Sequence, residues 1–123
     1  MTAEALKDEL QAAGIEYATG LERFMGNQGL YHKFLKKFVE TDTSHADFCA
    51  ALAQADMEQS EKTVHTLKGT SGNLGLMTLY HQADAVVQAI RAKSPLAEVQ
   101  KLSEAVTASY NETCAVLKKL LAE

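Results

Sequence analysis

The sequence predicts an all-α fold: an antiparallel up-down four-helix bundle with one or two short extra N-terminal helices. Strong helix formers (Ala, Leu, Glu, Lys and Gln) dominate the 123 residues. Only one proline is present, and no β-rich run of about four to eight residues stands out. Apolar residues instead recur at spacings of three and four, as they do on one face of a helix. The length suits one core, so we expect residues 1–123 to form a single domain.

Two short helices are expected before the bundle. Residues 3–13 have a thin apolar edge, formed by Leu6 and Leu10, and Gly14 is a natural stop. Residues 1–14 should therefore form a peripheral helix that packs on the outside of a larger body. Residues 15–25 can form a second short helix, which ends at the turn sequence Gly-Asn-Gln-Gly of residues 26–29.

The first long helix of the bundle is expected over residues 28–54. An apolar stripe keeps its phase across this stretch and consists of Leu30, Phe34, Phe38, Thr41, His45, Phe48 and Leu52. The segment Thr-Asp-Thr-Ser at residues 41–44 is a poor helix former, and Ser44 with Asp47 could cap a new start. The continuous stripe favours one long helix, and a bend near residue 43 is the alternative.

Three further helices complete the predicted bundle. A helix over 57–72 ends as glycines accumulate. A helix over 76–92 has the apolar face Leu76, Leu79, Ala83, Val86, Val87 and Ile90. A helix over 95–122 starts with Ser94 as N-cap and Pro95 in its first turn. It should bury Leu96, Val99, Leu102, Val106, Tyr110, Thr113, Leu117 and Leu120. Short connections make neighbours antiparallel, so residues 28–122 should form the four-helix bundle.

A histidine, a lysine and two glycines lie along one side of the predicted helix 57–72. At roughly 100° per residue, His65 lies about 130° from the middle of the flank that faces the core. That flank consists of Ser60, Val64, Leu67 and Ser71. His65 should therefore reach solvent, with Lys68, Gly69 and Gly72 beside it on the helix surface. Two glycines inside a helix cost about 1 kcal/mol each relative to alanine, which suggests a surface cleared for another molecule.

The stretch His65-x-Leu67-Lys68-Gly69-x-Ser71-x-x-Leu74-Gly75 resembles the signature of histidine-containing phosphotransfer (HPt) domains, the phosphorelay modules of two-component signalling. The resemblance is strong over residues 57–80 and looser, in helix pattern, over 15–122. It implies that His65 accepts a phosphoryl group through Nε2 from an aspartate on a response-regulator receiver domain. His65 would then pass the group to an aspartate on a second receiver. Lys68 would offset the added negative charge.

The resemblance also implies the partners and the docking surface. Receiver domains and a hybrid sensor histidine kinase are the expected partners of a monomer. The chain would need no cofactor of its own, because the receiver would contribute Mg²⁺. The surface around the histidine would consist of Gly69, Gly72, Lys62, Glu61, Gln88 and Arg91.

One position departs from the family pattern. In some relatives a glutamine on the following helix steadies the other nitrogen of the imidazole. The residue that aligns with it here is Val87, which cannot form a hydrogen bond. Gln88, Gln82 and Arg91 remain the candidates for this orienting role.

Two other functions share parts of this pattern. The phosphorylatable P1-type domain of a chemotaxis-type histidine kinase carries the same motif, and its donor is ATP on a separate catalytic domain. A non-catalytic helical adaptor would use the face around His65 only to bind a partner.

The glycines at 69, 72 and 75 follow a helix and lack the Gly-Lys-Ser/Thr ending of a nucleotide loop. We therefore expect a phosphocarrier without its own ATP site rather than an enzyme.

Composition argues against several other classes of function. The formal net charge of −4 gives no sign of nucleic-acid binding. No apolar run approaches the roughly 18 residues of a transmembrane helix, and the N-terminus lacks the pattern of a secretion signal. We therefore expect a cytoplasmic protein without direct membrane binding.

The remaining histidines and the cysteines do not predict a metal site. Metal sites in helical bundles use Glu-x-x-His pairs, and His32, His45 and His81 form none. His45 falls on the apolar stripe and is expected at the core boundary. Cys49 and Cys114 follow no metal or redox spacing, so both are expected to be small buried hydrophobes.

Overall fold

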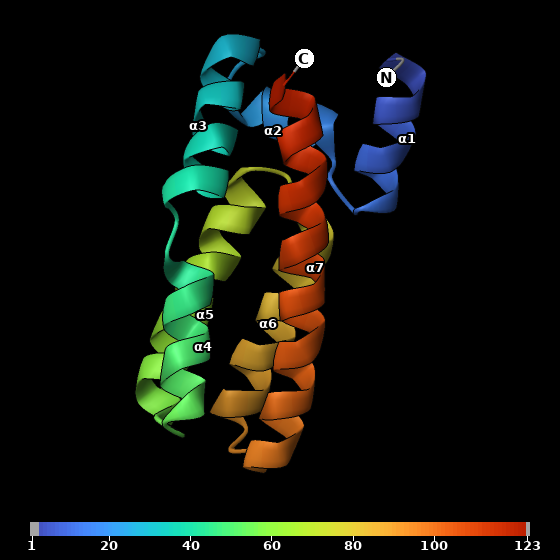
Figure 1. Cartoon of the computed structure of the whole chain (residues 1–123). Helices are drawn as coiled ribbons and strands as arrows, with labels where there is room; N and C mark the ends of the chain where they lie inside the picture. The colour runs from blue at the N-terminus through green and yellow to red at the C-terminus, as the bar shows by residue number, and fades with distance from the viewer. Residues whose placement is uncertain (1–2, 123) are drawn as a thin grey trace.

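The computed structural model describes residues 3–122, and within this range it contains helices and no strands (Figure 1). The all-α prediction is confirmed. The described elements are α1 (Ala3–Ala12), α2 (Tyr17–Arg23), α3 (Gln28–Thr41), α4 (Ser44–Ala53), α5 (Met57–Asn73), α6 (Met77–Arg91) and α7 (Leu96–Ala122). Except at the break between α3 and α4, helix ends fall within about two residues of the sequence prediction, which is the usual uncertainty of such boundaries.

Four helical columns make up the body of the molecule. The α3 and α4 helices follow one another along one column, and α5, α6 and α7 form the other three (Figure 1). Contacts join α4 to α5, α5 to α6, and α6 to α7, and α7 also packs against α3, α4 and α1. This arrangement fits a four-helix bundle. The long α7 extends beyond α5 and α6, so one end of the bundle is completed by the N-terminal helices.

The single helix predicted over residues 28–54 is wrong, and the alternative, a bend near residue 43, is what the structure contains. The side chain of Asp42 accepts hydrogen bonds from the backbone N–H and the hydroxyl of Ser44, at 3.2 and 2.6 Å. The hydroxyl of Thr43 donates to Asp47 at 2.9 Å, and Thr43 rather than Ser44 is the N-cap residue of α4. These short side chains bond to the local backbone and to one another, which competes with a continuous helix.

The break also changes which residues of α3 are buried. The buried residues of this helix are Tyr31, Leu35 and Phe38, whereas Leu30 and Phe34, predicted to face the core, are 40% and 39% exposed. Thr41 is exposed as well. Because α3 and α4 are separate helices, their buried faces need not keep one phase. The predicted stripe was therefore one residue out of register at Leu30 and Phe34 and correct at Phe38.

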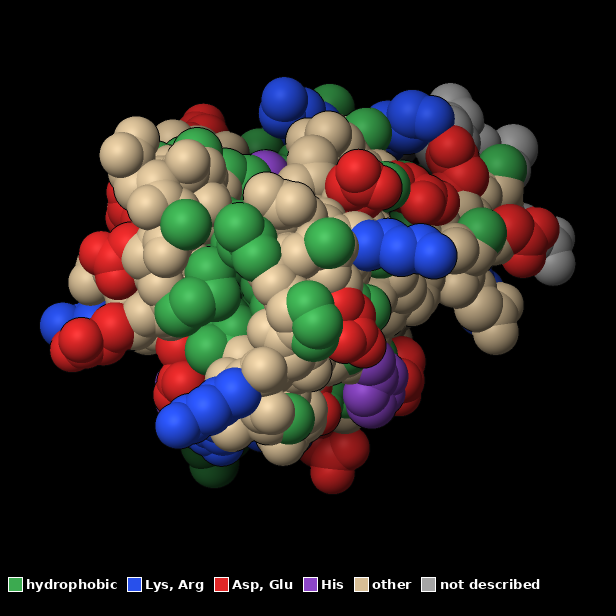
Figure 2. All heavy atoms as spheres, turned by 90° about the horizontal axis from the view of Figure 1, so that it is seen from below, with side chains coloured by type: hydrophobic (Ala, Val, Ile, Leu, Met, Phe, Trp, Pro, Cys, Tyr) green, Lys and Arg blue, Asp and Glu red, His purple; other side chains and the backbone are tan. Residues whose placement is uncertain are grey.

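The end of the bundle formed by the α4–α5 and α6–α7 connections carries exposed apolar surface. Figure 2 looks onto this end and shows hydrophobic side chains gathered at the surface, with charged groups around them. Leu96, predicted to be buried, is 40% exposed here. It is the first residue of α7, where no further turn of helix covers it.

The link between α1 and α2 is bonded to the turn between α5 and α6. The carbonyl of Gly14 accepts hydrogen bonds from Met77 N at 3.0 Å and Thr78 N at 3.3 Å, and Glu16 N donates to the carbonyl of Gly75 at 2.8 Å. Gly14 and Gly75 have φ angles of +76° and +77°, in the left-handed region that glycine favours at helix ends. The first N–H groups of α6, which have no partner within their own helix, are satisfied in this way.

A second contact holds α2 against the end of α5. The hydroxyl of Tyr31 is buried and donates a hydrogen bond to the carbonyl of Leu74 at 2.6 Å. Gly20 of α2 lies directly on this pair, because a Cβ at Gly20 would stand 2.6 Å from the same carbonyl and would overlap the Tyr31 hydroxyl. Only a glycine allows α2 to approach this closely.

Candidate functional site

The α5 helix begins at an N-cap and buries one face. The side chain of Asp56 accepts a hydrogen bond from Gln59 N at 3.0 Å, which satisfies one of the free N–H groups of the first turn. The buried residues of α5 are Ser60, Thr63, Val64, Leu67 and Ser71, which include all four that were predicted to face the core. His65 is exposed on the opposite side of the helix, where the helix geometry places it.

The imidazole of His65 has no hydrogen bond or ion pair with any other residue in the part of the chain that the structure describes. It lies at the border of two surface hollows of about 370 and 460 Å³. Besides His65, the first is lined by Arg23, Lys68, Gly69, Gly72, Asn73, Met77 and Tyr80. The second is lined by Glu58, Glu61, Lys62, Thr66 and Arg91. A histidine with a free, solvent-facing imidazole between two hollows can react with a group on another molecule.

Lys68 lies beside His65 but is already paired. Its Nζ is 2.9 Å from Oδ1 of Asp84 on α6, and it stands 5.8 Å from the centre of the Tyr80 ring. The ammonium of Lys68 is the main cause that holds the pKa of the Asp84 carboxyl below its usual value. A further hydrogen bond from Gln88 Nε2, at 3.2 Å, acts in the same direction. The positive charge predicted to stabilise a phosphoryl group is therefore shared with a carboxylate.

The two glycines beside His65 have different surroundings. A Cβ at Gly69 would meet no other atom within 4 Å, so this part of the surface is open. A Cβ at Gly72 would stand 3.0 Å from Cδ1 of Tyr80, which is closer than side chains normally pack. Gly72 therefore accommodates the ring of Tyr80 from α6. The sequence suggested only that Gly72 clears the surface for another molecule, and this packing contact was not predicted.

The second hollow is bordered by an ion pair between α5 and α6. Nε of Arg91 is 3.4 Å from Oε2 of Glu61, and both side chains are well exposed. Lys62 is exposed and forms no ion pair within the described residues. The structure thus gathers the sequence-predicted residues of α5 around His65, and it places Arg91 of α6 on the same hollow. Gln88 points instead to Asp84.

The orienting group for the imidazole stays unassigned. Val87 is completely buried in the core, so the position that aligns with the family's glutamine does not reach the surface at all. Neither Gln82, Gln88 nor Arg91 has a hydrogen bond to His65. Gln88 and Arg91 bond to carboxylates, and Oε1 of Gln82 is buried without a partner.

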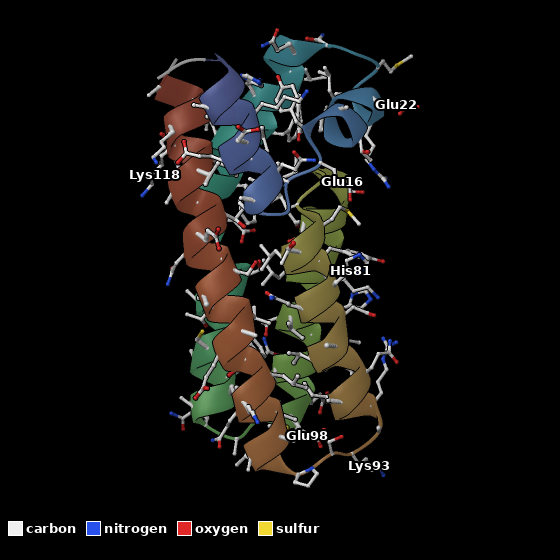
Figure 3. All side chains as sticks on the ribbon, turned by 90° about the vertical axis from the view of Figure 1, so that its right-hand side faces the viewer. Glu16, Glu22, His81, Lys93, Glu98 and Lys118 are labelled. Carbon is white, nitrogen blue, oxygen red and sulfur yellow. The ribbon has the colours of Figure 1, made fainter. Side chains whose placement is uncertain are left out.

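Among the residues missed in the sequence are Arg23 and Tyr80, which line the first hollow, and Asp84, which pairs with Lys68. Tyr80 and Asp84 stand one turn apart on the flank of α6 beside its buried face, a spacing that could have marked them as one cluster, and both lie against Lys68 of α5. Arg23 comes from α2, and no local pattern connects it with residues more than forty positions away. Figure 3 shows Glu22 of α2, and Glu16 at the N-cap of that helix, on the same side of the molecule as His81 of α6.

The other histidines have partners or different surroundings. His32 lies 2.6 Å from the Tyr17 hydroxyl, and His45 lies 3.0 Å from the Thr107 hydroxyl with its ring stacked on Tyr110. Burial lowers the pKa of both imidazoles. His45 thus occupies the core boundary, as predicted. Within residues 3–122, no three His, Cys, Asp or Glu side chains are grouped in a way that would hold a metal ion.

The prediction that both cysteines are buried is wrong for Cys49. Its side chain is exposed, with Sγ 3.4 Å from Nε2 of His45 on the preceding turn of α4. Cys114 is half-buried, and burial raises the pKa of its thiol. Phe48 and Leu52 form the buried face of α4, and Cys49 therefore lies outside that face.

In the described part of the chain, no helix is both long enough and apolar enough to cross a membrane. The family model of the Hpt domain matches residues 34–123, well over half of the chain. No curated protein and no solved structure matches the chain significantly.

Proposed function

The chain belongs to the Hpt domain family, whose members carry phosphoryl groups on histidine in two-component systems, and on this premise we propose that His65 is the phosphorylated residue. One observation carries the proposal. His65 is exposed, has no bonded partner within the described residues, and stands next to Lys68 and the open surface at Gly69. His32 and His45 are half-buried and hydrogen-bonded, which removes them as acceptors.

The proposed step is an in-line transfer between a receiver aspartate and His65. The lone pair of Nε2 attacks phosphorus, the bond from phosphorus to the aspartyl oxygen breaks, and its electron pair stays on the carboxylate. The proton on Nδ1 remains on the ring during the transfer. The reverse reaction onto a second receiver regenerates the free imidazole. Positioning supplies most of the catalysis in such transfers, so a rigid helix that presents the histidine suffices on this side.

Lys68 stabilises the product in this proposal. A phosphoryl group adds about −1.5 to −2 charge, which attracts the ammonium that lies beside it. In the free protein this ammonium is 2.9 Å from Asp84. Phosphorylation of His65 therefore makes the phosphoryl oxygens compete with the Asp84 carboxylate for the same cation.

The partners in this proposal are receiver domains, and a hybrid sensor histidine kinase is the source of the phosphoryl group. A receiver would bring Mg²⁺ with it, and the chain would act in the cytoplasm as a monomer without binding nucleic acid. We also propose the antiparallel up-down order for the four columns of the bundle. The open surface at Gly69, with Gly72, Glu61, Lys62, Gln88 and Arg91 around it, is the proposed docking face.

Incubation with phosphorylated receiver domains tests the proposal. The wild type should gain acid-labile phosphate, His65→Gln should gain none, and His81→Gln, which removes another exposed histidine, should be labelled like the wild type. Absence of label on the wild type would refute the relay. Label only in the presence of ATP and a separate kinase catalytic domain would instead identify a P1-type domain. A His65→Gln variant that is still labelled would show that the residue was assigned wrongly.

A further inference from the structure

The α2 helix packs on the C-terminal end of α5, beyond His65. Gly20 packs against the carbonyl of Leu74, and the backbone of Glu16 bonds to Gly75. Arg23 lies three residues after Gly20, so it stands one turn further along the same side of α2. This is the side that faces α5.

The side chain of Arg23 borders the same hollow as His65, Lys68, Gly69 and Gly72. It also borders a larger neighbouring groove of about 730 Å³, where it again lies with Asn73 of α5. Arg23 therefore lies near Asn73, at the C-terminal part of α5. It forms no hydrogen bond or ion pair with another residue in the range 3–122.

The surface between Arg23 and His65 is low along the two glycines, with the ring of Tyr80 packed against Gly72 at its border. The level of Gly72 is about 10 Å along the helix axis from that of His65, at roughly 1.5 Å per residue. Gly69 and Gly72 occupy the path between them and contribute no atoms beyond the backbone. A long, extended side chain can lie along this path toward a group bound to the imidazole.

The two positively charged side chains that line this hollow, Lys68 and Arg23, differ in whether a carboxylate already pairs with them. The ammonium of Lys68 is shared with Asp84, whereas the guanidinium of Arg23 is not neutralised by any described carboxylate. A phosphoryl group on His65 would bring about two negative charges into the hollow. An arginine fork donates two parallel hydrogen bonds to such a group, which a lysine cannot do.

We propose that Arg23 is the second cation of the phosphoryl site and binds the phosphoryl oxygens of phosphorylated His65. The proposal rests on the function proposed above for His65. Arg23 precedes residue 34, where the family match begins, so this contribution comes from the part of the chain that the family pattern does not describe.

Phosphoramidate, a small phosphoryl donor, tests the contact without a partner protein. Nε2 of His65 attacks its phosphorus, the bond from phosphorus to nitrogen breaks, and ammonia leaves with a proton from solvent. The ³¹P NMR signal of the product, assigned by its absence in His65→Gln, reports the ionisation of the phosphoryl group. Arg23→Ala should raise the phosphoryl pKa by about 0.3–0.7 unit, the size expected for an exposed charge pair.

Matched variants separate a direct contact from an indirect effect. Lys36→Ala removes the same charge from α3, where Lys36 borders a different hollow with His32 and Lys118, and should leave the phosphoryl pKa unchanged. Arg23→Lys should keep part of the effect. Arg23→Gln keeps the length of the side chain without the charge, so it gives the same readout if Arg23→Ala loses its helical circular dichroism.

The outcomes distinguish this inference from the function on which it rests. If Arg23→Ala and Arg23→Gln titrate like Lys36→Ala, Arg23 does not bind the phosphoryl group, and the role of His65 stands. If neither phosphoramidate nor phosphorylated receivers label the wild type at His65, the proposed function itself fails.

Discussion

The ammonium of Lys68 lies 2.9 Å from the carboxylate of Asp84, and this pair joins α5 to α6 beside the histidine. The ammonium that would stabilise a phosphoryl group is thus held in place, but the Asp84 carboxylate already neutralises part of its charge. Asp84 therefore has two opposing effects, because it positions Lys68 and also competes with the phosphoryl group for it.

Asp84→Asn should favour the phosphorylated form of His65. The amide has the size of the carboxylate without its charge, so Lys68 becomes free to pair with the phosphoryl oxygens. The equilibrium with a phosphorylated receiver should shift about two- to five-fold toward the labelled chain, the range that exposed ion pairs give. Asp8→Asn on α1 is the matched control. A shift in the opposite direction would mean that positioning of Lys68 outweighs competition.

Alanine at Gly69 and at Gly72 should affect stability differently. Gly69→Ala meets no atom within 4 Å, so it should raise the free energy of unfolding by about 1 kcal/mol through helix propensity alone. Gly72→Ala places a Cβ 3.0 Å from the Tyr80 ring, which must move, and the gain should be smaller or reversed. Urea denaturation measures both. Equal gains would show that the Tyr80 ring does not limit this position.

A large side chain at Gly69 should block docking without blocking the chemistry. We expect Gly69→Leu to lower the rate of transfer from a receiver about tenfold or more, which corresponds to a loss of about 1.4 kcal/mol or more in binding. Labelling by phosphoramidate should stay within about a factor of two of the wild type, since this donor needs no docking surface. Ala46→Leu, at an exposed position of α4, controls for an added leucine. Unchanged transfer from the receiver would place the docking face elsewhere.

Tyr31→Phe should destabilise the protein by about 1–3 kcal/mol, because it leaves the buried carbonyl of Leu74 without its hydrogen bond. Tyr80→Phe removes a hydroxyl that has no hydrogen bond within residues 3–122, and it should change the free energy of unfolding little. Urea denaturation of both variants measures the difference. If the two variants lose the same stability, the bond from Tyr31 to Leu74 contributes nothing specific.

Stability should fall as the pH is lowered through the range in which histidine titrates. Burial lowers the pKa of His45 and His32 in the folded state, so the unfolded chain, with its ordinary value near 6.5, binds protons first. The free energy of unfolding should therefore decrease as pH falls from about 7 toward 5. His45→Gln should reduce this slope in urea titrations at several pH values. His32→Gln should reduce it as well, and an unchanged slope in both variants would contradict this prediction.

Local patterns were sufficient for α5 and α6, the helices that carry most of the site. Each is amphipathic within its own length, so the buried faces could be read without knowledge of the partners. The same reasoning failed in α3. The stripe was followed through residues 41–44, but the bonds of Ser44 to Asp42 and of Thr43 to Asp47 separate the two helices. The phase of one helix therefore does not constrain the other.

The contacts around His65 depend on residues from different helices, and these were predicted only in part. The pairing of Lys68 with Asp84 and the approach of Tyr80 to Gly72 require the packing of α5 on α6. The position of Arg23 requires the fit of Gly20 onto Leu74. Sequence spacing carries no information about such approaches between elements.

The bonds from Gly14 to Met77 and Thr78 make the N-terminal segment a structural part of the helix that flanks His65. The family match begins at residue 34, inside α3, yet the first turn of α6 depends on a carbonyl twenty residues earlier. The part of the chain that matches the family is therefore hydrogen-bonded to a residue outside the match. By the family match this part starts at residue 34, whereas its backbone hydrogen bonds extend to Gly14.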